Sequence, residues 1–522
     1  MSAGLPFAKV GVKVGVLGLG RSGRSAARFL AGLGVELPGV GAAGAVVPAV
    51  GVAGAVVPAV VKAEIRAVDA AEGPEVAAAA AELATLGVQA VLGANDESLA
   101  EWADVLVVSP GVPPSNPVIA RAQARGIPVW SEIELASHYS SSIGLPILAV
   151  TGTNGKTTTT ALLAAILTEG GWHAIAAGNI GYPLVDAVAE LRAESPAARV
   201  AQGEPVLVCE VSSFQLAFAP TFRPAIAVVL NVADDHYDWH AGYDDYLRAK
   251  AQIVAHQEAG DLVIVNAADP GACSIAAGAA ARVAAFGLGT PDEVAAQGAE
   301  AIGRPLAAAA GIDDGWLSAG PPGAAIPLVE IAKIRLHGPH NRENVLAAGL
   351  AAQAWGVEPA AVGRAVAAFG PLPHRSTLVR EIEGVRYIDD SKATNPHATL
   401  RALQGLERVV LIAGGRAKGL DLSPVAGELP RLKGVVAMGE ATAELEGLFA
   451  GRLPFATAAW VEDAVATAAG WAQPGDTVLL SPACSSLDQY QSYAERGNRF
   501  AAAVRALPPA EPTGPSGLGG RP

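Results

Sequence analysis

The segment from Leu145 to Leu167, LPILAVTGTNGKTTTTALLAAIL, limits the possible folds of this chain more than any other. An apolar, strand-like run is followed by a turn with Gly152 and Gly155, then by Lys156, Thr157 and an Ala- and Leu-rich stretch typical of a helix. This order predicts a phosphate-binding loop, because backbone N–H groups and a helix N-terminus then face the anion. We expect Lys156 to contact nucleotide phosphates and the Thr157 hydroxyl to bind Mg²⁺.

The predicted loop is shorter than the usual P-loop, which has a glycine where Val150 stands. A chance Gly-Lys-Thr turn is the alternative interpretation. The strand before the loop and the helix after it favour nucleotide binding.

A second glycine-rich turn follows the strand-like run 12–17 near the N-terminus. Gly18, Gly20 and Gly23 have the G-x-G-x-x-G spacing of a dinucleotide-binding turn. Such a turn holds any diphosphate, so it does not by itself imply NAD, and a tight strand–helix packing turn is the alternative. The next strand is split between 35–37 and 64–68 and ends in Asp69. If the sequence between is an insertion, Asp69 falls near the acidic position that binds a ribose hydroxyl in such units.

That intervening sequence has no charged residue from Leu37 to Val61 and contains a tandem copy, GAAGAVVPAV at 41–50 followed by GVAGAVVPAV at 51–60. The segment is long enough to span a bilayer. Its composition of Ala, Gly, Val and Pro, together with the repeat, favours a low-complexity loop instead. We therefore expect an insertion over about 38–62 and no integral membrane segment.

Strands alternating with helices predict parallel sheets, so the fold class is α/β. A length of 522 residues fits about three domains. We expect boundaries at an N-terminal domain 1–144, a central domain 145–372, a C-terminal domain 373–507 and a disordered tail 508–522. Within the central domain, the Ala-, Gly- and Pro-rich stretch from about 269 to 330 predicts edge strands and loops, and a helix is expected over 345–355.

The net charge of −14 argues against nucleic acid or an anionic membrane as a partner. Cys209, Cys273 and Cys484 are far apart and have no metal or disulfide spacing, so small buried side chains in a reducing compartment are expected. The N-terminus MSAGLPFAKVGVKV lacks the layout of a secretory signal.

Polar side chains follow several predicted strands of the central domain. Glu210 comes directly after an apolar run and is a plausible Mg²⁺ ligand beside a phosphate loop. His236 is the best metal or substrate candidate within the NVADDHYDWH segment, where solvated turn charges are the alternative. Asn179 in the turn GNIG suits a polar substrate. Lys250 lies on an amphipathic helix, and its pattern alone favours a surface lysine.

Strand ends of the C-terminal domain carry basic and hydroxyl side chains. In an acidic chain, this clustering predicts a pocket for carboxylate or phosphate groups. Its expected members are Arg375, Lys392, Arg416, Lys418, Thr394, Ser485 and Ser486.

Across essentially the whole chain these motifs resemble the Mur ligase family of peptidoglycan synthesis. The shared signal comprises TGTNGKTTT, GNIG, EVSSFQL, NVADDH and HNRENVLAA. The segments GLGRSG, PHR, DDSKATNP and SPACSSLDQY are similar to the subgroup that adds D-glutamate. The resemblance implies an N-terminal Rossmann-like UDP-binding domain, a central P-loop ATPase-like parallel sheet and a C-terminal Rossmann-like domain.

The resemblance also implies roles for individual residues. Catalysis would involve Lys156, Lys250, His236 and Glu210. ATP would be bound by Gly152, Thr153, Asn154, Gly155, Lys156, Thr157, Thr158, Asn344, Arg375 and Asp390. The UDP substrate would be bound by Arg21, Ser22, Asp69, Ser109, Gly111 and Asn179, with Pro110 between the two loop residues. D-Glutamate would be bound by Lys392, Thr394, Lys418, Ser486, Leu487 and Tyr493. Two Mg²⁺ ions would be held by Thr157, Glu210, His236 and Lys250.

In the family the matching lysine is carbamylated by CO₂, so the resemblance replaces the surface interpretation of Lys250 with a carbamate that binds metal. The implied reaction joins UDP-N-acetylmuramoyl-L-alanine to D-glutamate with ATP, through an acyl phosphate. It would be a cytoplasmic step of cell-wall synthesis, needed for cell shape and division, and carried out by a monomer. Tyr493 departs from the expected pattern, because an aromatic residue without a hydroxyl is usual there.

Three alternatives remain. A sister ligase would use another amino acid, such as L-glutamate. A folate polyglutamate ligase would not need the N-terminal GLGRSG domain. A nucleotide-dependent binding or regulatory module would lack catalysis altogether.

Overall fold

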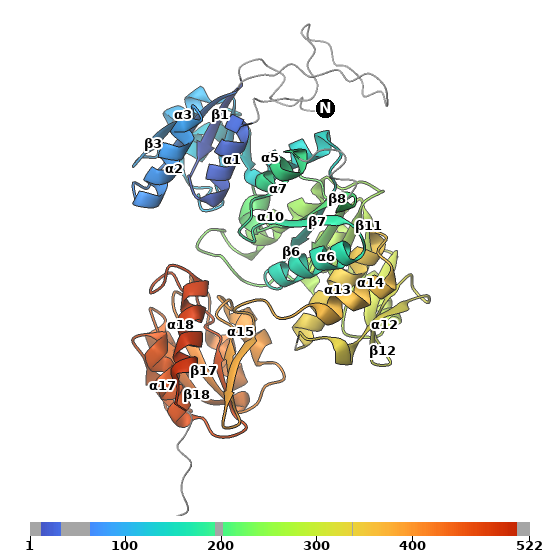
Figure 1. Cartoon of the computed structure of the whole chain (residues 1–522), viewed down its shortest axis with the longest axis vertical. Helices are drawn as coiled ribbons and strands as arrows, with labels where there is room; N and C mark the ends of the chain where they lie inside the picture. The colour runs from blue at the N-terminus through green and yellow to red at the C-terminus, as the bar shows by residue number, and fades with distance from the viewer. Residues whose placement is uncertain (1–11, 33–62, 194–201, 337, 509–522) are drawn as a thin grey trace, which may run out of the picture. The chain divides into compact units, whose positions relative to one another are not determined.

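The computed structural model describes residues 12–32, 63–193, 202–336 and 338–508, which form three sheets (Figure 1). The mixed α/β architecture confirms the predicted fold class. The tandem repeat, the run 35–37 predicted as half of a split strand, and almost all of the predicted tail lie outside the described residues.

The first sheet has the strand order β3-β2-β1-β4-β5, and all of its strand pairs are parallel. Helices cover both faces, since α1 contacts α2 and α5, α3 contacts α4, and α1 and α3 both contact β1. The strands are β1 (Lys13–Leu17), β2 (Glu64–Asp69), β3 (Gln89–Leu92), β4 (Val105–Val108) and β5 (Val129–Ser131). The helices are α1 (Arg21–Gly32), α2 (Pro74–Thr85), α3 (Ser98–Trp102), α4 (Pro117–Ala124) and α5 (Glu132–Ser142).

The central sheet has the order β14-β13-β12-β11-β10-β9-β6-β8-β7, parallel from β7 to β12 and antiparallel beyond. Its strands are β6 (Ile147–Thr151), β7 (His173–Gly178), β8 (Pro205–Glu210), β9 (Ile226–Val229), β10 (Leu262–Asn266), β11 (Arg282–Phe286), β12 (Ala308–Asp313), β13 (Trp316–Gly320) and β14 (Ile326–Glu330). The helices of this stretch are α6 (Lys156–Glu169), α7 (Leu184–Ala193), α9 (Ser213–Leu216), α10 (Tyr243–Ala255), α11 (Pro270–Ala277), α12 (Pro291–Ile302), η2 (Ile331–Lys333), α13 (Pro339–Ala354) and α14 (Pro359–Ala368).

Two segments of this part differ from expectation. The stretch 269–330, predicted to hold edge strands and loops, also contains α11, α12 and the internal strands β11 to β13. Its many alanines pack closely, and Ala284, Ala285 and Ala309 are fully buried. Helix α13 begins at Pro339 rather than at Val345, so the HNREN motif lies inside the helix.

The third sheet has the order β15-β16-β20-β17-β18-β19, with only β15 antiparallel to its neighbour. Alternate residues of β17 enter two different cores: Val410 and Ile412 pack on the α17/α18 side, and Leu411 packs on the α15/α16 side. The strands are β15 (Thr377–Ile382), β16 (Val385–Asp389), β17 (Val409–Gly414), β18 (Leu432–Met438), β19 (Phe455–Thr457) and β20 (Thr477–Leu480). The helices are α15 (Pro396–Leu403), η3 (Ser423–Arg431), α16 (Thr442–Phe449), α17 (Val461–Trp471) and α18 (Tyr493–Ala506).

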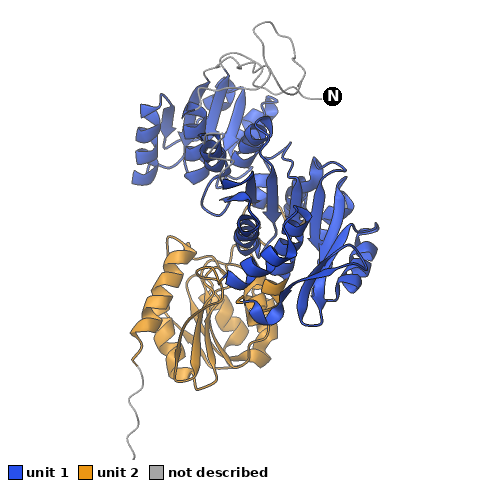
Figure 2. Cartoon of the chain, turned by 45° about the vertical axis from the view of Figure 1, so that its right-hand side comes forward, with its two compact units in different colours: residues 1–232, 244–334, 343–369 blue, residues 233–243, 335–342, 370–522 orange. Residues whose placement is uncertain are grey.

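The chain divides into two compact units (Figure 2). The first unit holds the first two sheets, and its parts are residues 1–232, 244–334 and 343–369. The second unit holds the third sheet together with two short segments, and its parts are residues 233–243, 335–342 and 370–522. The short segment 233–243, which follows the central strand β9 and the loop 230–232 in sequence, therefore packs with the C-terminal sheet.

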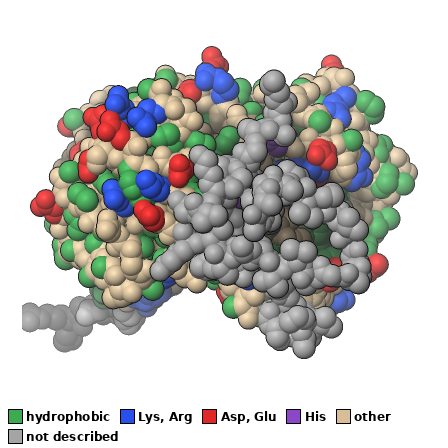
Figure 3. Space-filling model, turned by 90° about the horizontal axis from the view of Figure 1, so that it is seen from above, with side chains coloured by type: hydrophobic (Ala, Val, Ile, Leu, Met, Phe, Trp, Pro, Cys, Tyr) green, Lys and Arg blue, Asp and Glu red, His purple; other side chains and the backbone are tan. Residues whose placement is uncertain are grey.

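None of the described helices combines the length and hydropathy needed to cross a membrane. Acidic and basic side chains lie interspersed on the face shown in Figure 3. The three cysteines are buried and unpaired, as expected from their spacing.

Candidate active site

The predicted phosphate loop connects the fully buried strand β6 to helix α6. Gly155 precedes the helix with φ +88°, a left-handed conformation that favours glycine. A Cβ atom at this position would lie 2.4 Å from Oδ1 of Asn344, which itself accepts a hydrogen bond from Thr159 Oγ1. Asn344 therefore packs directly against the loop, and both backbone conformation and space exclude a side chain at residue 155.

Asn231 braces the same loop from the neighbouring strand. Its backbone carbonyl accepts from Thr153 N at 2.9 Å, and its side-chain Oδ1 accepts from Asn154 N at 2.8 Å. Its Nδ2 donates back to the Asn154 carbonyl at 3.1 Å. Asn231 was not among the residues predicted from the sequence. Its position just after β9, which pairs with β6, is the signal that could have identified it.

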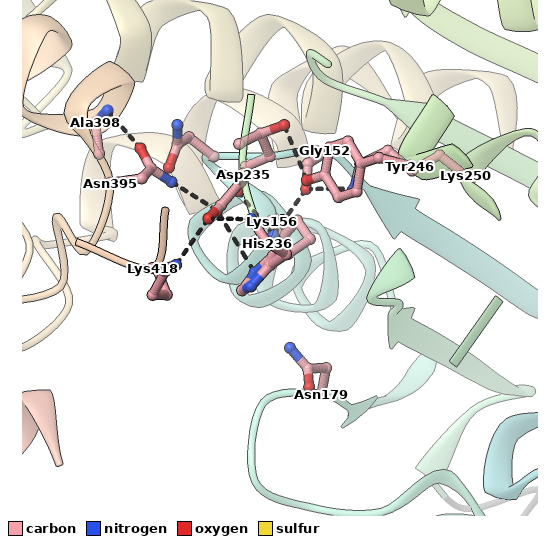
Figure 4. A network of polar contacts seen from close by, with 12 residues as sticks. Gly152, Lys156, Asn179, Asp235, His236, Tyr246, Lys250, Asn395, Ala398 and Lys418 are labelled. Carbon is pink, nitrogen blue, oxygen red and sulfur yellow. Dashed lines mark hydrogen bonds and ion pairs between the residues drawn. The ribbon is translucent and has the colours of Figure 1, made fainter. Parts of the chain in front are cut away.

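Two lysines donate to one carbonyl of the phosphate loop (Figure 4). Lys156 Nζ lies 2.7 Å from the Gly152 oxygen and 2.9 Å from the Thr153 oxygen. Lys250 Nζ lies 3.0 Å from the same Gly152 oxygen and 4.4 Å from the ring centroid of Tyr246. Lys250 is only 1% exposed, so the pattern-based interpretation of a surface lysine is wrong.

Glu210 ends strand β8, which pairs with β6, so its carboxylate belongs to the strand next to the phosphate loop. The side chain is 2% exposed, and Oε1 accepts from Asn179 Nδ2 at 3.1 Å. Among the described residues, its buried Oε2 has no hydrogen-bond partner. A buried carboxylate oxygen without a donor fits a divalent cation, because Mg²⁺ takes one or two carboxylates and completes its shell with phosphate oxygens and water. No described group of three or more His, Cys, Asp or Glu side chains could hold a metal by itself.

The N-terminal glycine turn is closely packed. A Cβ atom on Gly18 would lie 2.9 Å from Ser109 Cβ, and one on Gly20 would lie 3.3 Å from Ser109 Oγ, which brings the loop after β4 against the turn. Asp69 Oδ2 accepts from Leu19 N at 2.5 Å, so its carboxylate holds the turn itself. Close packing of the glycine turn against Ser109 is expected if the turn binds a diphosphate and also if it only packs a strand against a helix.

Arg21 connects two of the segments predicted for the UDP substrate. It starts α1, and its Nη1 donates to the Gly181 carbonyl of the GNIG turn at 3.0 Å. Two other residues predicted for this substrate differ in exposure: Ser22 is half-buried and Gly111 is exposed. Within the first unit, the glycine turn, the loop after β4 and the GNIG turn thus lie next to one another.

In the second unit, Asp390 is buried where β16 ends. Its Oδ1 accepts from Ser376 N at 2.9 Å, and its Oδ2 accepts from Ser481 Oγ at 3.0 Å. Burial raises the pKa of Asp390 to about 7, although these hydrogen bonds and the charge of Arg375 oppose the shift. The carboxyl is therefore partly protonated near neutral pH.

Asp235 and Lys418 form a buried ion pair in the second unit (Figure 4). Lys418 Nζ lies 2.7 Å from Asp235 Oδ1, and Asn395 Nδ2 donates to Asp235 Oδ2 at 2.8 Å. Burial opposes ionisation, but the charges of Lys418 and His236 more than offset it and lower the pKa of Asp235. His236 Nε2 lies 3.5 Å from the same carboxylate. The metal candidates Thr157, Glu210 and Lys250 belong to the first unit, so a shared role for His236 stays a prediction.

The remaining residues predicted for the amino acid also lie in the second unit. Lys392 Nζ lies 3.9 Å from the ring centroid of Tyr493, Ser486 is 2% exposed, and Leu487 is 61% exposed. Thr394 is two residues beyond Lys392 in the chain, and its N–H donates to the Lys392 carbonyl at 2.9 Å. Arg416, in contrast, makes a two-point exposed ion pair with the carboxylate of Glu440.

The chain matches three models of one family. They are described as a Mur ligase MurD-like N-terminal domain, a Mur ligase middle domain and a Mur ligase glutamate ligase domain, over residues 51–131, 150–352 and 374–484 respectively. A curated relative from Frankia casuarinae, named UDP-N-acetylmuramoylalanine–D-glutamate ligase, is 41% identical over 500 residues, covering 95% of this chain and 94% of the relative. The chain belongs to the Mur ligase family.

A relative of the same name from Geobacter metallireducens is 38% identical and covers 95% of this chain and 98% of its own length. The fold is also that of solved Mur ligases. The UDP-N-acetylmuramate-alanine ligase of Thermotoga maritima superposes with a TM-score of 0.52 at 17% identity, covering 94% of this chain and 99% of that one.

Within this Mur ligase, the structure brings together the predicted groups inside each unit. The first unit joins the phosphate loop to Lys250, Glu210 and Asn344. The second unit gathers the loops that carry Asp390, Lys418 and Ser486 at the carboxyl edge of the third sheet. Sequence reasoning missed one residue of this second group, Arg496, whose side chain hydrogen-bonds the ends of β16, β17 and β20.

Proposed function

We propose that this Mur ligase joins D-glutamate to the terminal carboxylate of UDP-N-acetylmuramoyl-L-alanine, using ATP and passing through an acyl phosphate. The two relatives above carry the name of this activity over nearly their whole length, which supports D-glutamate over L-glutamate as the amino acid. The observation that carries the proposal is the unpartnered Glu210 oxygen on the strand beside a phosphate loop that holds two buried or half-buried lysines.

The first step forms a bond between a carboxylate oxygen of the UDP substrate and the γ-phosphorus of ATP, and ADP leaves. Lys156 swings from its loop carbonyls to the phosphoryl oxygens and stabilises the charge that they gain. Glu210 and the Thr157 hydroxyl would hold Mg²⁺, which would supply further charge neutralisation. Asn344, Arg375 and Asp390 bind the adenosine part of ATP.

In the second step, the amine nitrogen of D-glutamate attacks the acyl carbon and the bond to phosphate breaks. The amine loses a proton as the amide forms, and His236 is the proposed acceptor. Asp235 lies beside its ring and stabilises the imidazolium that results. The residues proposed to hold the two carboxylates of D-glutamate are Lys392, Thr394, Lys418, Ser486, Leu487 and Tyr493.

We propose a carbamate on Lys250. Two ammonium groups that donate to the same Gly152 carbonyl repel each other, and burial strengthens this repulsion because little water screens it. A CO₂-derived carbamate replaces one of these cations by an anion that can bind a second Mg²⁺ when the metal is present. The UDP diphosphate and uridine would contact Arg21, Ser22, Asp69, Ser109, Gly111 and Asn179.

The decisive measurement is phosphate release from ATP with UDP-N-acetylmuramoyl-L-alanine and a panel of D- and L-amino acids. We expect release with D-glutamate and none with L-glutamate. Release with L-glutamate alone would favour the sister ligase, and no release with any amino acid would favour a binding module. We propose that the protein acts in the cytoplasm, as a monomer, in cell-wall synthesis.

A further inference from the structure

Helix α18 contains an arginine that is completely buried. Arg496 is 0% exposed, although it lies only three residues from the start of the helix. Burial lowers its pKa to about 10, and the guanidinium remains charged at neutral pH. A buried charge is costly unless its N–H groups are hydrogen-bonded, so the hydrogen bonds of Arg496 show what stabilises it in the fold.

Within the described residues, the side-chain hydrogen bonds of Arg496 go to three loops that end parallel strands. Its Nε donates to Ser391 Oγ at 3.1 Å and one Nη2 hydrogen goes to the Ser391 carbonyl at 2.9 Å, both in the loop after β16. Nη2 also donates to the Cys484 carbonyl at 3.2 Å, in the loop after β20. Nη1 donates to the Gly414 carbonyl at 3.3 Å, where β17 ends.

These three loops are those that carry the residues proposed to bind the amino acid. Lys392 directly follows Ser391, Ser486 is two residues beyond Cys484, and Lys418 is four residues beyond Gly414. The acceptors are carbonyls and a hydroxyl, so these hydrogen bonds do not neutralise the charge of Arg496. The guanidinium therefore holds the three loops together, and the nearby carboxylates of Asp389 and Asp488 partly offset its charge.

The first turn of α18 reinforces this arrangement. The Ser391 hydroxyl donates to the Tyr493 carbonyl at 2.8 Å, and the Tyr493 ring lies beneath the Lys392 ammonium. Arg416 and Ser485 exchange backbone hydrogen bonds of 2.9 Å in both directions, which joins the loops after β17 and β20. The loops after β16 and β20 are joined by the hydrogen bond from Ser481 Oγ to Asp390 Oδ2 at 3.0 Å, and Arg496 is the side chain that contacts all three loops at once.

We propose that Arg496 is a positioning residue for the acidic amino acid: it fixes the three loops that bind the substrate's two carboxylates in one geometry. The inference rests on the proposed function. A planar guanidinium with donors in fixed directions can span three loops, whereas the point charge of a lysine cannot.

The test compares Arg496→Met and Arg496→Lys with the matched control Arg499→Met on the same helix. Arg499 bonds Glu462 at 2.7 and 2.9 Å and lies over the rings of Trp460 and Tyr490, with no described hydrogen bond to the three strand ends. We expect Arg496→Met to raise the KM for D-glutamate by about tenfold or more, because charged hydrogen bonds are lost. Arg496→Lys should raise it less, and the control should not raise it. The KM for ATP should rise less than that for D-glutamate, because only one of the three loops, through Asp390, also carries a proposed ATP contact.

A half-reaction separates positioning from general damage. Hydroxylamine can replace the amino acid: its nitrogen attacks the acyl carbon, phosphate leaves, a proton is lost and a hydroxamate forms. Arg496→Met should still form hydroxamate at the wild-type rate from ATP, UDP-N-acetylmuramoyl-L-alanine and hydroxylamine. An unchanged KM for D-glutamate would overturn the proposal. An equal rise of the KM values for D-glutamate, ATP and UDP-N-acetylmuramoyl-L-alanine, together with loss of hydroxamate formation, would also overturn it.

Ser391→Ala serves if Arg496→Met does not fold. It removes the hydroxyl that links Nε to the Tyr493 carbonyl, and it should raise the KM for D-glutamate in the same direction by a smaller factor. No effect of Ser391→Ala on that KM would count against the positioning role. Absence of turnover of D-glutamate by the wild-type protein would instead contradict the proposed function itself.

Discussion

The phosphate loop and the amino-acid loops both place lysines at the carboxyl ends of parallel strands, but they are built in different ways. The phosphate loop is one continuous segment, Gly152 to Thr157, with a left-handed glycine just before helix α6 and direct contacts from Asn231 and Asn344. The amino-acid site is assembled from the ends of β16, β17 and β20, which are far apart in the sequence. Its shape depends on contacts such as those of Arg496.

The difference has a consequence for mutation. A continuous loop fails through local backbone strain or through loss of a directly contacting side chain. A site built from three loops fails when a distant buried side chain no longer holds them, even though every substrate contact is still encoded. Variants in the two regions separate these two modes of failure.

The largest effect is expected for Lys250→Ala in the phosphate-loop region. We expect kcat to fall by about a hundredfold or more, as for the loss of a group that stabilises transition-state charge. Short carboxylic acids should restore part of the activity, because their carboxylate can occupy the space of the proposed carbamate.

The matched control is Lys333→Ala, since the Lys333 side chain is 57% exposed and pairs with Glu330 at the surface. Phosphate release measured with and without added acetate gives the answer. Normal turnover of Lys250→Ala would show that the buried amine needs no carbamate.

The next effect is expected for Gly155→Ala. Its φ of +88° and the 2.4 Å approach of Asn344 Oδ1 both oppose a Cβ atom. We expect a loss of about 1–3 kcal/mol in unfolding free energy and a higher KM for ATP.

Gly171→Ala provides the control, because Gly171 has φ +90° but no described neighbouring atom within 4 Å of the position that a Cβ atom would take. It should cost about 1–2 kcal/mol from backbone strain alone and leave the KM for ATP unchanged. Equal effects of the two variants on the KM for ATP would show that contact with Asn344 does not shape the loop. Chemical denaturation and steady-state kinetics measure both quantities.

A third prediction concerns pH. Glu132 begins α5, is fully buried, and accepts from Val185 N at 2.6 Å where α7 begins. Burial raises the pKa of Glu132 from 4.5 to about 7, with a smaller contribution from Asp186 in the same direction. The folded state therefore binds more protons than the unfolded state between these values, and its stability falls as pH rises from about 4.5 to about 7.

Glu132→Gln keeps the acceptor for Val185 and removes the charge. Between pH 4.5 and pH 8, the charge on Glu132 should cost the wild-type protein up to about 3 kcal/mol of unfolding free energy, and we expect Glu132→Gln to avoid this loss. Glu101→Gln, at a half-exposed carboxyl paired with Arg121, should keep the wild-type pH profile. Urea unfolding at several pH values measures the slope, and an unchanged slope in Glu132→Gln would assign the pH dependence to other groups such as Asp390.

The sequence was sufficient for the phosphate loop because strand, turn and helix are adjacent in it. It was also sufficient for most strand positions, since buried parallel strands such as Val105–Val108 are short apolar runs. Lys250 was misread from its pattern, yet the pattern held the signal. The buried residues of α10 are Tyr246, Ala249, Lys250, Ile253 and Val254, so the lysine falls on the apolar face of the helix.

Asn231, Glu132 and Arg496 were not found because each has at least one hydrogen-bond partner 50 or more residues away. Their residue types are ordinary for a turn, a helix N-terminus and a helix surface. Only the topology, which brings β9 beside β6 and β17 beside β20, gives them their partners. Arg496 had one local sign, because it lies on the same helical face as the buried Phe500 and Val504.

The smallest effect is expected for Arg416→Ala in the amino-acid region. The sequence groups Arg416 with Lys418, but the two side chains differ in the structure. Arg416 pairs with Glu440 at the surface, where both side chains are about half exposed, whereas Lys418 is 9% exposed and lies 2.7 Å from Asp235. An exposed ion pair is screened by water and salt and contributes little.

We therefore expect Arg416→Ala to leave the melting temperature and the KM for D-glutamate unchanged. Lys418→Ala is the comparison variant and should raise that KM, because it removes a proposed carboxylate contact and leaves Asp235 buried without its cation. If Arg416→Ala raised the KM as strongly as Lys418→Ala, the exposed guanidinium would have to exchange Glu440 for the substrate. The pocket would then use all of its basic loops, as their clustering in the sequence predicts, and would depend less on the buried contacts that hold those loops together.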